Sequence, residues 1–315
     1  MMSILTRHWN LQPKREPVPE NLEHIVTTSI AEAILQGAHD LRRAGVSEPR
    51  REAGSLLAHA LGQDRTFIVS HADDSISEEQ LERFRDDLAA RVGRKPLQYI
   101  TGHQEFYGLD FEVNQDVLIP RPETELLVDL AIKSPPTPDV APFICDVGTG
   151  SGCVAITLLQ QLPRARAVAI DISAAALMVA KRNAARHVVT DRIEFIESDC
   201  FAELDPLKTK FDLIVSNPPY VTEGALAGLQ REVRDFEPRL ALMAGPDGLA
   251  VINRLLLAAP AFLKAGGLFL FEIGFDQSAA IERLMKEPAA GAWKLLGIHP
   301  DLQGIPRVVA LEKRG

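Results

Sequence analysis

Apolar residues recur every three or four positions in the first third of the chain. Three such runs extend from Ile30 to Leu41, from Ala53 to Leu61 and from Leu81 to Val92. This spacing is typical of amphipathic helices, and a glycine suited to end a helix follows each run, at Gly45, Gly62 and Gly93. We therefore predict a helical domain over residues 28–95. It carries no cluster of catalytic residue types and is interpreted as a recognition or packing module.

Residues 96–120 change to a β-like pattern. Aromatic residues alternate with glycines in this segment, at Tyr99, Gly102, Phe106, Gly108 and Phe111. The pattern predicts a hairpin that links two domains. A helix is expected next, over residues 121–133, because a proline suits its first turn and acidic side chains suit its positive end. Residues 134–138 are proline-rich and predict a stiff spacer.

Short apolar runs alternate with helical patterns from residue 142 onward. The expected strands are Phe143–Val147, Arg166–Ile170, Arg192–Ile196, Phe211–Val215 and Leu268–Ile273. The expected helices are Gly152–Gln161, Ala174–Arg186, Gly248–Leu263 and Gln277–Lys286. This alternation predicts an α/β fold with a parallel, doubly wound sheet over residues 121–315. Two late runs, Trp293–Ile298 and Arg307–Leu311, are close together and predict an antiparallel pair.

Composition narrows the classes of function. The 315 residues include 43 acidic and 34 basic side chains, which give a net charge of −9. A chain this acidic is a poor non-specific ligand for nucleic acid, and the short basic run from Arg91 to Lys95 does not reverse that. The longest apolar stretch, Leu255–Leu263, is too short to span a membrane.

Cysteine and histidine usage points to a reducing compartment. The three cysteines, Cys145, Cys153 and Cys200, include no Cys-x-x-Cys pair, and the eight histidines are scattered. We expect no disulfide framework, no metal site and a cytoplasmic location. Residues 1–27 are polar, contain three prolines and have no apolar core of a signal peptide. They are expected to form a disordered leader.

A polar and rigid motif follows the predicted strand that ends at Val215. It consists of Ser216, Asn217, Pro218, Pro219 and Tyr220. The Asn217 amide oxygen and the Pro218 carbonyl can each accept a hydrogen bond, and Tyr220 offers a flat apolar face. The motif suits a planar group that carries an amino nitrogen, such as an amide or a base amine. The same residues also fit an ordinary turn, so the motif gains weight only with other signals.

Three upstream strand ends supply those signals. The first predicted strand runs into an acidic residue and a glycine-rich loop, made of Asp146, Gly148, Thr149, Gly150, Ser151 and Gly152. Glycines let the backbone of such a loop approach a ligand closely. Asp171 ends the second strand, where it can accept hydrogen bonds from ribose hydroxyls, and Asp199 and Cys200 end the third, where they can flank an adenine. Together with Asn217, these are the expected cofactor-binding residues.

The glycine spacing separates two kinds of cofactor. A dinucleotide fingerprint reads Gly-x-Gly-x-x-Gly, but Cys153 occupies the position of its last glycine here. The spacing found, Gly-x-Gly-x-Gly after Asp146, resembles that of class I S-adenosylmethionine-dependent methyltransferases. The Asn-Pro-Pro-Tyr motif resembles that of methyltransferases which modify amide or exocyclic amino nitrogens. A nicotinamide oxidoreductase and a non-catalytic binding module remain as weaker alternatives.

Further motifs narrow the resemblance to the HemK/PrmC family, over nearly all of residues 28–315. They are Glu105–Gly108, Ile119–Glu125, Arg234–Pro238 and Asp301–Val308. The resemblance implies a protein-(glutamine-N5) methyltransferase with a class I, Rossmann-like fold, S-adenosyl-L-methionine as cofactor and bacterial class I release factors as partners. It implies no membrane and no stable nucleic acid. A sister branch acting on a ribosomal protein usually lacks the Arg-Pro-Glu-Thr-Glu run, and a DNA adenine-N6 enzyme would need a basic face.

The resemblance also assigns roles to individual residues. Asn217 and Pro218 would accept both hydrogens of the glutamine amide, and Phe106 and Tyr220 would enclose its apolar stem beside Pro219. Ordinary core packing is the alternative for both aromatic residues. The Arg121 and Glu123 side chains fit either cofactor binding or a surface ion pair. Cys200 departs from the family, whose members often carry an aromatic or other residue near the adenine.

Overall fold

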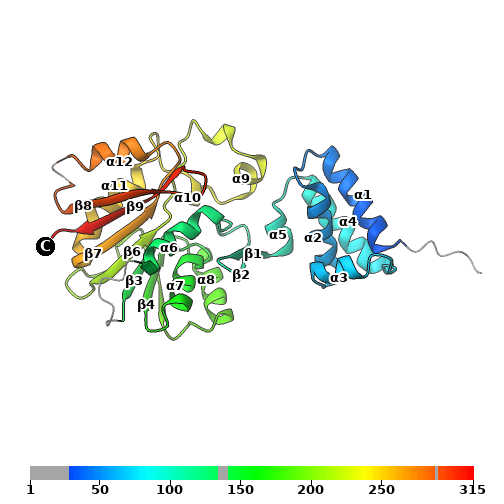
Figure 1. Cartoon of the computed structure of the whole chain (residues 1–315), viewed down its shortest axis with the longest axis horizontal. Helices are drawn as coiled ribbons and strands as arrows, with labels where there is room; N and C mark the ends of the chain where they lie inside the picture. The colour runs from blue at the N-terminus through cyan, green and yellow to red at the C-terminus, as the bar shows by residue number, and fades with distance from the viewer. Residues whose placement is uncertain (1–27, 134–140, 288–289) are drawn as a thin grey trace, which may run out of the picture.

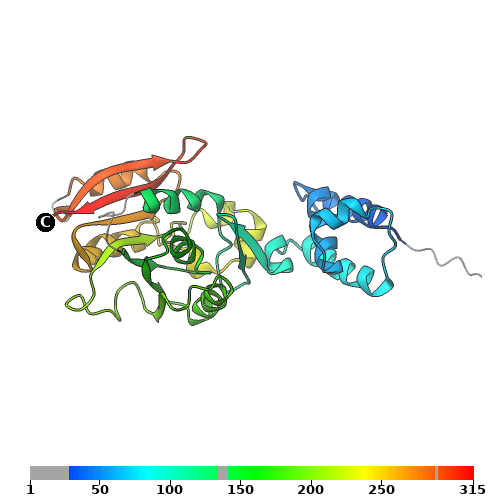
Figure 2. The same cartoon turned by 60° about the horizontal axis from the view of Figure 1, so that its bottom comes forward.

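The computed structural model describes residues 28–133, 141–287 and 290–315 (Figure 1). The leader predicted for residues 1–27 and the spacer predicted for residues 134–138 lie outside the described residues. Both views show the N-terminal helices as a separate body beside a larger α/β body (Figures 1 and 2). Within the described ranges, no helix is long and apolar enough to cross a membrane.

Within residues 28–101, four helices form the N-terminal body and a fifth, short helix follows them. They are α1 (Ile30–Arg43), α2 (Pro49–Leu61), α3 (Arg65–Ser70), α4 (Glu78–Val92) and α5 (Leu97–Thr101). Serine capping boxes start α1 and α4, at Ser29 and Ser77. The apolar stripes of α1, α2 and α4 pack into one core, which includes Leu41, Leu56 and Phe84. The three predicted helices are therefore confirmed, whereas α3 is too short to give a periodic signal.

A short helix and a hairpin connect the two bodies. The strands β1 (His103–Phe106) and β2 (Leu109–Glu112) pair antiparallel, as the turn pattern predicted. The β-like interpretation of Tyr99 is wrong, because Tyr99 lies in α5. Its hydroxyl donates to the Val117 carbonyl at 2.6 Å, and its ring is buried, so tertiary packing accounts for the aromatic residue there.

A seven-stranded sheet organises the larger body. Its strands are β3 (Phe143–Val147), β4 (Arg166–Asp171), β5 (Ile193–Glu197), β6 (Phe211–Ser216), β7 (Leu263–Glu272), β8 (Trp293–Pro300) and β9 (Pro306–Lys313). Their order across the sheet is β5-β4-β3-β6-β7-β9-β8. The first five are parallel, and β9 pairs antiparallel with both β7 and β8. The predicted sheet and its late antiparallel pair are confirmed.

Helices cover both faces of the sheet (Figure 2). Their bounds are η1 (Pro122–Thr124), α6 (Glu125–Lys133), α7 (Cys153–Gln161), α8 (Ala174–Arg186), η2 (Leu226–Gly228), α9 (Arg231–Phe236), α10 (Arg239–Leu242), α11 (Ala250–Ala258), η3 (Ala259–Ala261) and α12 (Ser278–Leu284). Alternate strand residues feed two cores, with Ile144 in the core under α6 and α7 and Cys145 in the core under α11 and α12. The predicted helix 248–263 is shorter than expected, because Pro260 lies in η3 and Leu263 begins β7.

The chain order of the strands creates a switch point beside β3. The chain moves from β3 through β4 to β5 and then returns to the other side of β3 as β6. The loops that leave β3 and β6 therefore diverge at the carboxyl edge of the sheet. Crevices at such points are the usual ligand sites of open α/β sheets.

Candidate functional site

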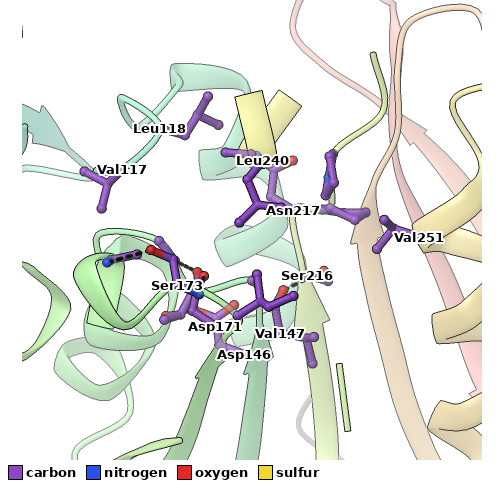
Figure 3. A pocket seen from close by; sticks show the side chains of 18 of the residues that line it. Val117, Leu118, Asp146, Val147, Asp171, Ser173, Ser216, Asn217, Leu240 and Val251 are labelled. Atoms are coloured by element: carbon purple, nitrogen blue, oxygen red, sulfur yellow. Dashed lines mark hydrogen bonds between the residues drawn. The ribbon is translucent and has the colours of Figure 1, made fainter. Parts of the chain in front are cut away.

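A cavity of about 270 Å³ lies at the carboxyl ends of the central strands (Figure 3). Its walls come from the loops after β3, β4, β5 and β6, from the segment before η1, and from α10 and α11. The volume is close to the lower limit of small-molecule sites, about 300 Å³. Figure 3 shows Asp146, Asp171, Ser216 and Asn217 gathered around it. The four strand ends that the sequence predicted to meet do meet here.

The three glycines of the loop after β3 have different structural roles. A Cβ added at Gly148 or Gly150 would meet nothing within 4 Å, so the backbone of both residues is bare. A Cβ at Gly152 would lie 2.8 Å from Ile156 Cδ1 and 3.2 Å from Ala180 Cβ. Gly152 therefore permits α7 to pack against α8 and does not line the cavity. Gly148 and Gly150 offer the close backbone approach that a ligand needs.

Asp146 is hydrogen-bonded to the glycine loop and to the helix that follows it. Its carboxylate accepts from Thr149 Oγ1 at 2.7 Å and from the Ala155 N–H at 3.2 Å, and the residue is only 2% exposed. Burial raises the pKa of Asp146 to about 7, although these hydrogen bonds oppose the shift. Asp146 also borders the cavity. The hydrogen bonds give it a role in shaping the loop; direct contact with a cofactor stays a prediction.

Asp171 joins the end of β4 to the same loop. Its carboxylate accepts from the Gly150 N–H at 2.8 Å and from the Ser173 N–H at 2.9 Å. Burial raises the pKa of Asp171, and the backbone N–H donors oppose that shift. A carboxylate has about four acceptor positions, so the carboxylate can still accept from a ligand hydroxyl. Since Asp171 lines the cavity, the structure places it where the sequence predicted.

The end of β5 adds an ion pair that the sequence did not reveal. Asp199 pairs with Arg254 of α11 at 2.7 Å, and the hydrogen bond from Arg254 lowers the pKa of Asp199. Asp199, Cys200 and Arg254 all line the cavity. Burial raises the pKa of the Cys200 thiol, which favours the neutral form. Adenine packing against Asp199 and Cys200 stays a prediction.

The motif after β6 forms the opposite wall of the cavity. Asn217, Pro218 and Pro219 line it, and Ser216 Oγ donates to the Val147 carbonyl at 2.7 Å, which ties β6 to β3. Asn217 Nδ2 donates to Thr124 Oγ1 at 3.0 Å. One hydrogen of the amide nitrogen is thus bonded to the protein, and the amide oxygen is available to accept a hydrogen bond from a ligand.

The two aromatic residues predicted to hold the substrate lie behind the wall. Phe106 is 1% exposed and packs edge-on against Phe111 in the core, with 6.2 Å between ring centroids. Tyr220 donates toward Glu272 Oε1 at 3.4 Å. Burial raises the pKa of Tyr220 above its usual value. The structure does not bring either ring onto the cavity surface, so their contact with a substrate stays a prediction and core packing accounts for Phe106.

Arg121 pairs with a distant acidic residue. Its guanidinium donates to Glu237, which is 4% exposed and also accepts from the Ile119 N–H. The segment before η1 is thereby attached to the segment after α9, and both border the cavity. This pair connects two motifs that lie more than 100 residues apart in the chain.

Thr124, Arg254 and Glu272 are the site residues that the sequence analysis missed. A usable signal existed for Glu272, because this single carboxylate lies between the apolar run Leu268–Phe271 and Ile273. Thr124 lay inside a quoted motif but is a common helix-start residue, and Arg254 lies on a helix with no distinguishing pattern. Across the residues that the structure describes, no cluster of three or more His, Cys, Asp or Glu side chains could hold a metal ion.

Known proteins resemble this chain along most of its length. The family description "PrmC N-terminal domain" matches residues 32–102, and "Methyltransferase small domain" matches residues 124–233. The release factor glutamine methyltransferase of Koribacter versatilis is 40% identical over 90% of this chain and 99% of its own. The enzyme of that name from Chlorobaculum tepidum is 44% identical over 76% of this chain and 83% of its own.

A solved structure supports the fold independently. The structure of a methyltransferase from Pyrococcus furiosus aligns with a TM-score of 0.50 at 16% identity. The alignment covers 72% of this chain and 98% of that chain. At this identity the likeness concerns the fold alone, and it agrees with the predicted Rossmann-like methyltransferase architecture.

Proposed function

This chain belongs to the release factor glutamine methyltransferase family, and from that premise we propose that it methylates the side-chain amide nitrogen of a glutamine in release factors. The observation that carries the proposal is the identity of 40–44% to enzymes of that name, over 83–99% of their lengths. The Asn217 amide oxygen, presented at the cavity wall, supports it chemically. The acceptor glutamine is that of the Gly-Gly-Gln motif in bacterial class I release factors.

The methyl donor in this proposal is S-adenosylmethionine. It supplies a methyl group bonded to a positively charged sulfur, which a nucleophile can displace. Gly148 and Gly150 would admit it closely, since a Cβ at either position would enter open space. Asp171 would accept from its ribose hydroxyls, and Asp199 and Cys200 would border its adenine. The acidic residue at the end of β4 and the bare glycine backbone both fit this cofactor.

Asn217 and Pro218 act on the substrate. A glutamine amide nitrogen is a poor nucleophile, because its lone pair is delocalised into the carbonyl group. Two acceptors, Asn217 Oδ1 and the Pro218 carbonyl, would hold both N–H groups and fix the nitrogen in line with the methyl group. They would also favour the positive character that the nitrogen gains as the new N–C bond forms, while the methyl C–S bond breaks and its electron pair stays with the sulfur, which leaves as a neutral thioether. The nitrogen then releases one proton to solvent, which restores a neutral amide.

The N-terminal body would recognise the release factor as a folded protein. It contacts the larger body through Arg91 in the last turn of α4 and Arg94 just after that helix, which pair with Glu232 of α9 at 3.0 Å and 2.7 Å. The net charge of −9 favours a protein partner over nucleic acid. A substrate that acts in translation, together with free cysteines at 145, 153 and 200, supports a cytoplasmic location.

Mass spectrometry tests this function directly. Purified release factor is incubated with the enzyme and isotope-labelled S-adenosylmethionine, and the peptide that contains the Gly-Gly-Gln sequence is sequenced. We expect one labelled methyl group on the glutamine side chain. A release factor with that glutamine replaced is the control. Label on the control, or none on the natural sequence, would overturn the proposal.

A further inference from the structure

An asparagine that must accept from a substrate amide has to present its oxygen. Rotation of the Asn217 side-chain amide by 180° would exchange oxygen and nitrogen with little change in shape. Asn217 Nδ2 donates to Thr124 Oγ1 at 3.0 Å. A hydroxyl can donate as well as accept, so Thr124 alone would tolerate either orientation of the amide.

Glu272 removes that ambiguity. Thr124 Oγ1 donates to Glu272 Oε2 at 2.6 Å, and an ionised carboxylate can only accept. The single hydroxyl hydrogen of Thr124 is therefore used, and only its lone pairs remain for Asn217. Both residues are buried, at 2% exposure for Thr124, which borders the cavity, and 1% for Glu272. Their burial limits competition from water for these hydrogen bonds.

We propose that Thr124 and Glu272 are positioning residues, which set the Asn217 amide with its oxygen toward the methyl-accepting nitrogen. The inference rests on the proposed function and deepens it. It gives a role to the Arg-Pro-Glu-Thr-Glu run, whose threonine supplies the hydroxyl. It also includes Tyr220, whose hydroxyl lies 3.4 Å from the other Glu272 oxygen.

A purely structural role would not require a carboxylate. Glu272 follows the apolar residues Leu268–Phe271 of β7, where an apolar side chain would pack at lower cost. Removing a carboxylate from water is unfavourable unless its partners compensate. The partners here are two hydroxyl groups, and the one nearer to it is the residue that holds Asn217.

The charge of Glu272 depends on four neighbouring groups. Burial raises the pKa of Glu272 to about 7, while the Thr124 hydroxyl and Arg307 of β9 oppose the shift and Glu123 of η1 adds to it. Tyr220 also lowers the pKa through its hydroxyl. Once protonated, the carboxyl group can donate to Thr124, which frees the threonine hydrogen to turn toward Asn217. The orientation is therefore specified only where Glu272 is ionised.

Two substitutions of Thr124 distinguish its effect on the orientation of the Asn217 amide from its effect on packing. Thr124→Val keeps the shape but removes the hydroxyl, whereas Thr124→Ser keeps the hydroxyl and removes a methyl group. At about pH 8 we expect kcat of Thr124→Val to fall roughly tenfold to a hundredfold, because a misaligned acceptor costs that much. Thr124→Ser should recover most of the loss, and the Kd for S-adenosylmethionine and the Tm should change little in either variant. Equal kcat values for the two variants would overturn the proposal.

A pH profile supplies a readout that packing alone would not change. Glu272→Gln keeps the shape and an acceptor but cannot titrate. With saturating S-adenosylmethionine, wild-type kcat should rise between about pH 6 and pH 8, while the Gln variant gives a flat profile. The same inflection in both proteins would overturn the inference and leave the proposed function standing. Failure of the wild-type enzyme to methylate any release factor would overturn both.

Discussion

The Gly150 N–H donates to Asp171 Oδ2 at 2.8 Å, which joins the glycine loop after β3 to the end of β4. One carboxylate thus fixes the shape of the loop and remains within reach of the cavity. The glycine loop and the end of β4, which form two parts of the expected cofactor site, are therefore directly hydrogen-bonded to each other. A change at Asp171 should consequently affect both the loop and the ligand.

Asp171→Ala should weaken the binding of S-adenosylmethionine by roughly tenfold to a hundredfold. The substitution removes a charged acceptor, and hydrogen bonds to charged groups contribute about 1.5–3 kcal/mol. Calorimetric titration with S-adenosylmethionine, and separately with NAD, measures the change. Asp191→Ala, which removes an exposed carboxylate outside the cavity, is the matched control. An unchanged Kd in Asp171→Ala, or tight NAD binding by the wild type, would contradict the assignment.

The strand ends could be located from sequence because each strand of a parallel sheet is buried on both faces. Such strands read as continuous apolar runs, and β3 and β6 were found nearly to the residue. The polar residues at or next to the carboxyl ends of these strands, Asp146, Asp171 and Asn217, then fall at one edge by topology alone. Short elements that depend on tertiary contacts, such as α3 and α5, carried no comparable signal.

Asp146 should make stability depend on pH in a measurable way. Its pKa is raised from 3.8 to about 7, so the folded state holds a proton that the unfolded chain has lost. The stability from this group is fully present below about pH 4 and is lost as pH rises through 7. The loss amounts to about 4 kcal/mol at most, at about 1.4 kcal/mol per pKa unit.

Denaturant unfolding of the wild type and of Asp146→Asn between about pH 5 and pH 8 checks this. The wild type should lose stability relative to the variant as pH rises, because asparagine does not titrate. Asp171 and Glu272 are present in both proteins, so the difference isolates Asp146. Parallel stability curves would show that Asp146 titrates normally.

The side-chain pairs between residues far apart in the chain could not be predicted from the sequence. Thr124 and Glu272 are separated by 148 positions, and Arg91 and Glu232 by 141, so no local pattern connects either pair. Each pair forms only after the elements have docked. A carboxylate within an apolar strand was the one local sign of the first pair, and it identifies a buried charge without naming its partner.

Glu232→Ala should weaken recognition of the release factor but not of the cofactor. Glu232 holds Arg91 and Arg94 at the junction of the two bodies, and Arg91 keeps its second partner, Glu52. We expect KM for the release factor to rise roughly tenfold, which corresponds to about 1.4 kcal/mol. The Kd for S-adenosylmethionine should not change. Arg231→Ala, at an exposed position in the same helix, is the control, and an equal rise in both variants would refute the role.

Asn217→Ala should lower turnover while sparing the cofactor. Asn217 reaches Thr124 through its nitrogen, and the loss of its oxygen removes one preorganised acceptor from the transition state. Such losses cost about 10²–10³ in kcat. Asn217→Asp keeps an acceptor and the shape but loses the donor to Thr124 and adds a charge. Single-turnover methyl transfer to release factor, with the Gly-Gly-Gln glutamine replaced in a control, measures each rate.

Tyr220→Ala should change KM and kcat in the opposite proportion to Asn217→Ala. The Tyr220 ring is predicted to pack against the apolar stem of the glutamine, and such a contact is made in the ground state and the transition state alike, so its removal should raise KM more than it lowers kcat. Asn217→Ala should do the reverse, because an interaction made mainly in the transition state appears in kcat. Wild-type rates from Asn217→Ala would refute its assigned contact with the amide. A similar split between KM and kcat in the two variants would show that Asn217 acts only in binding.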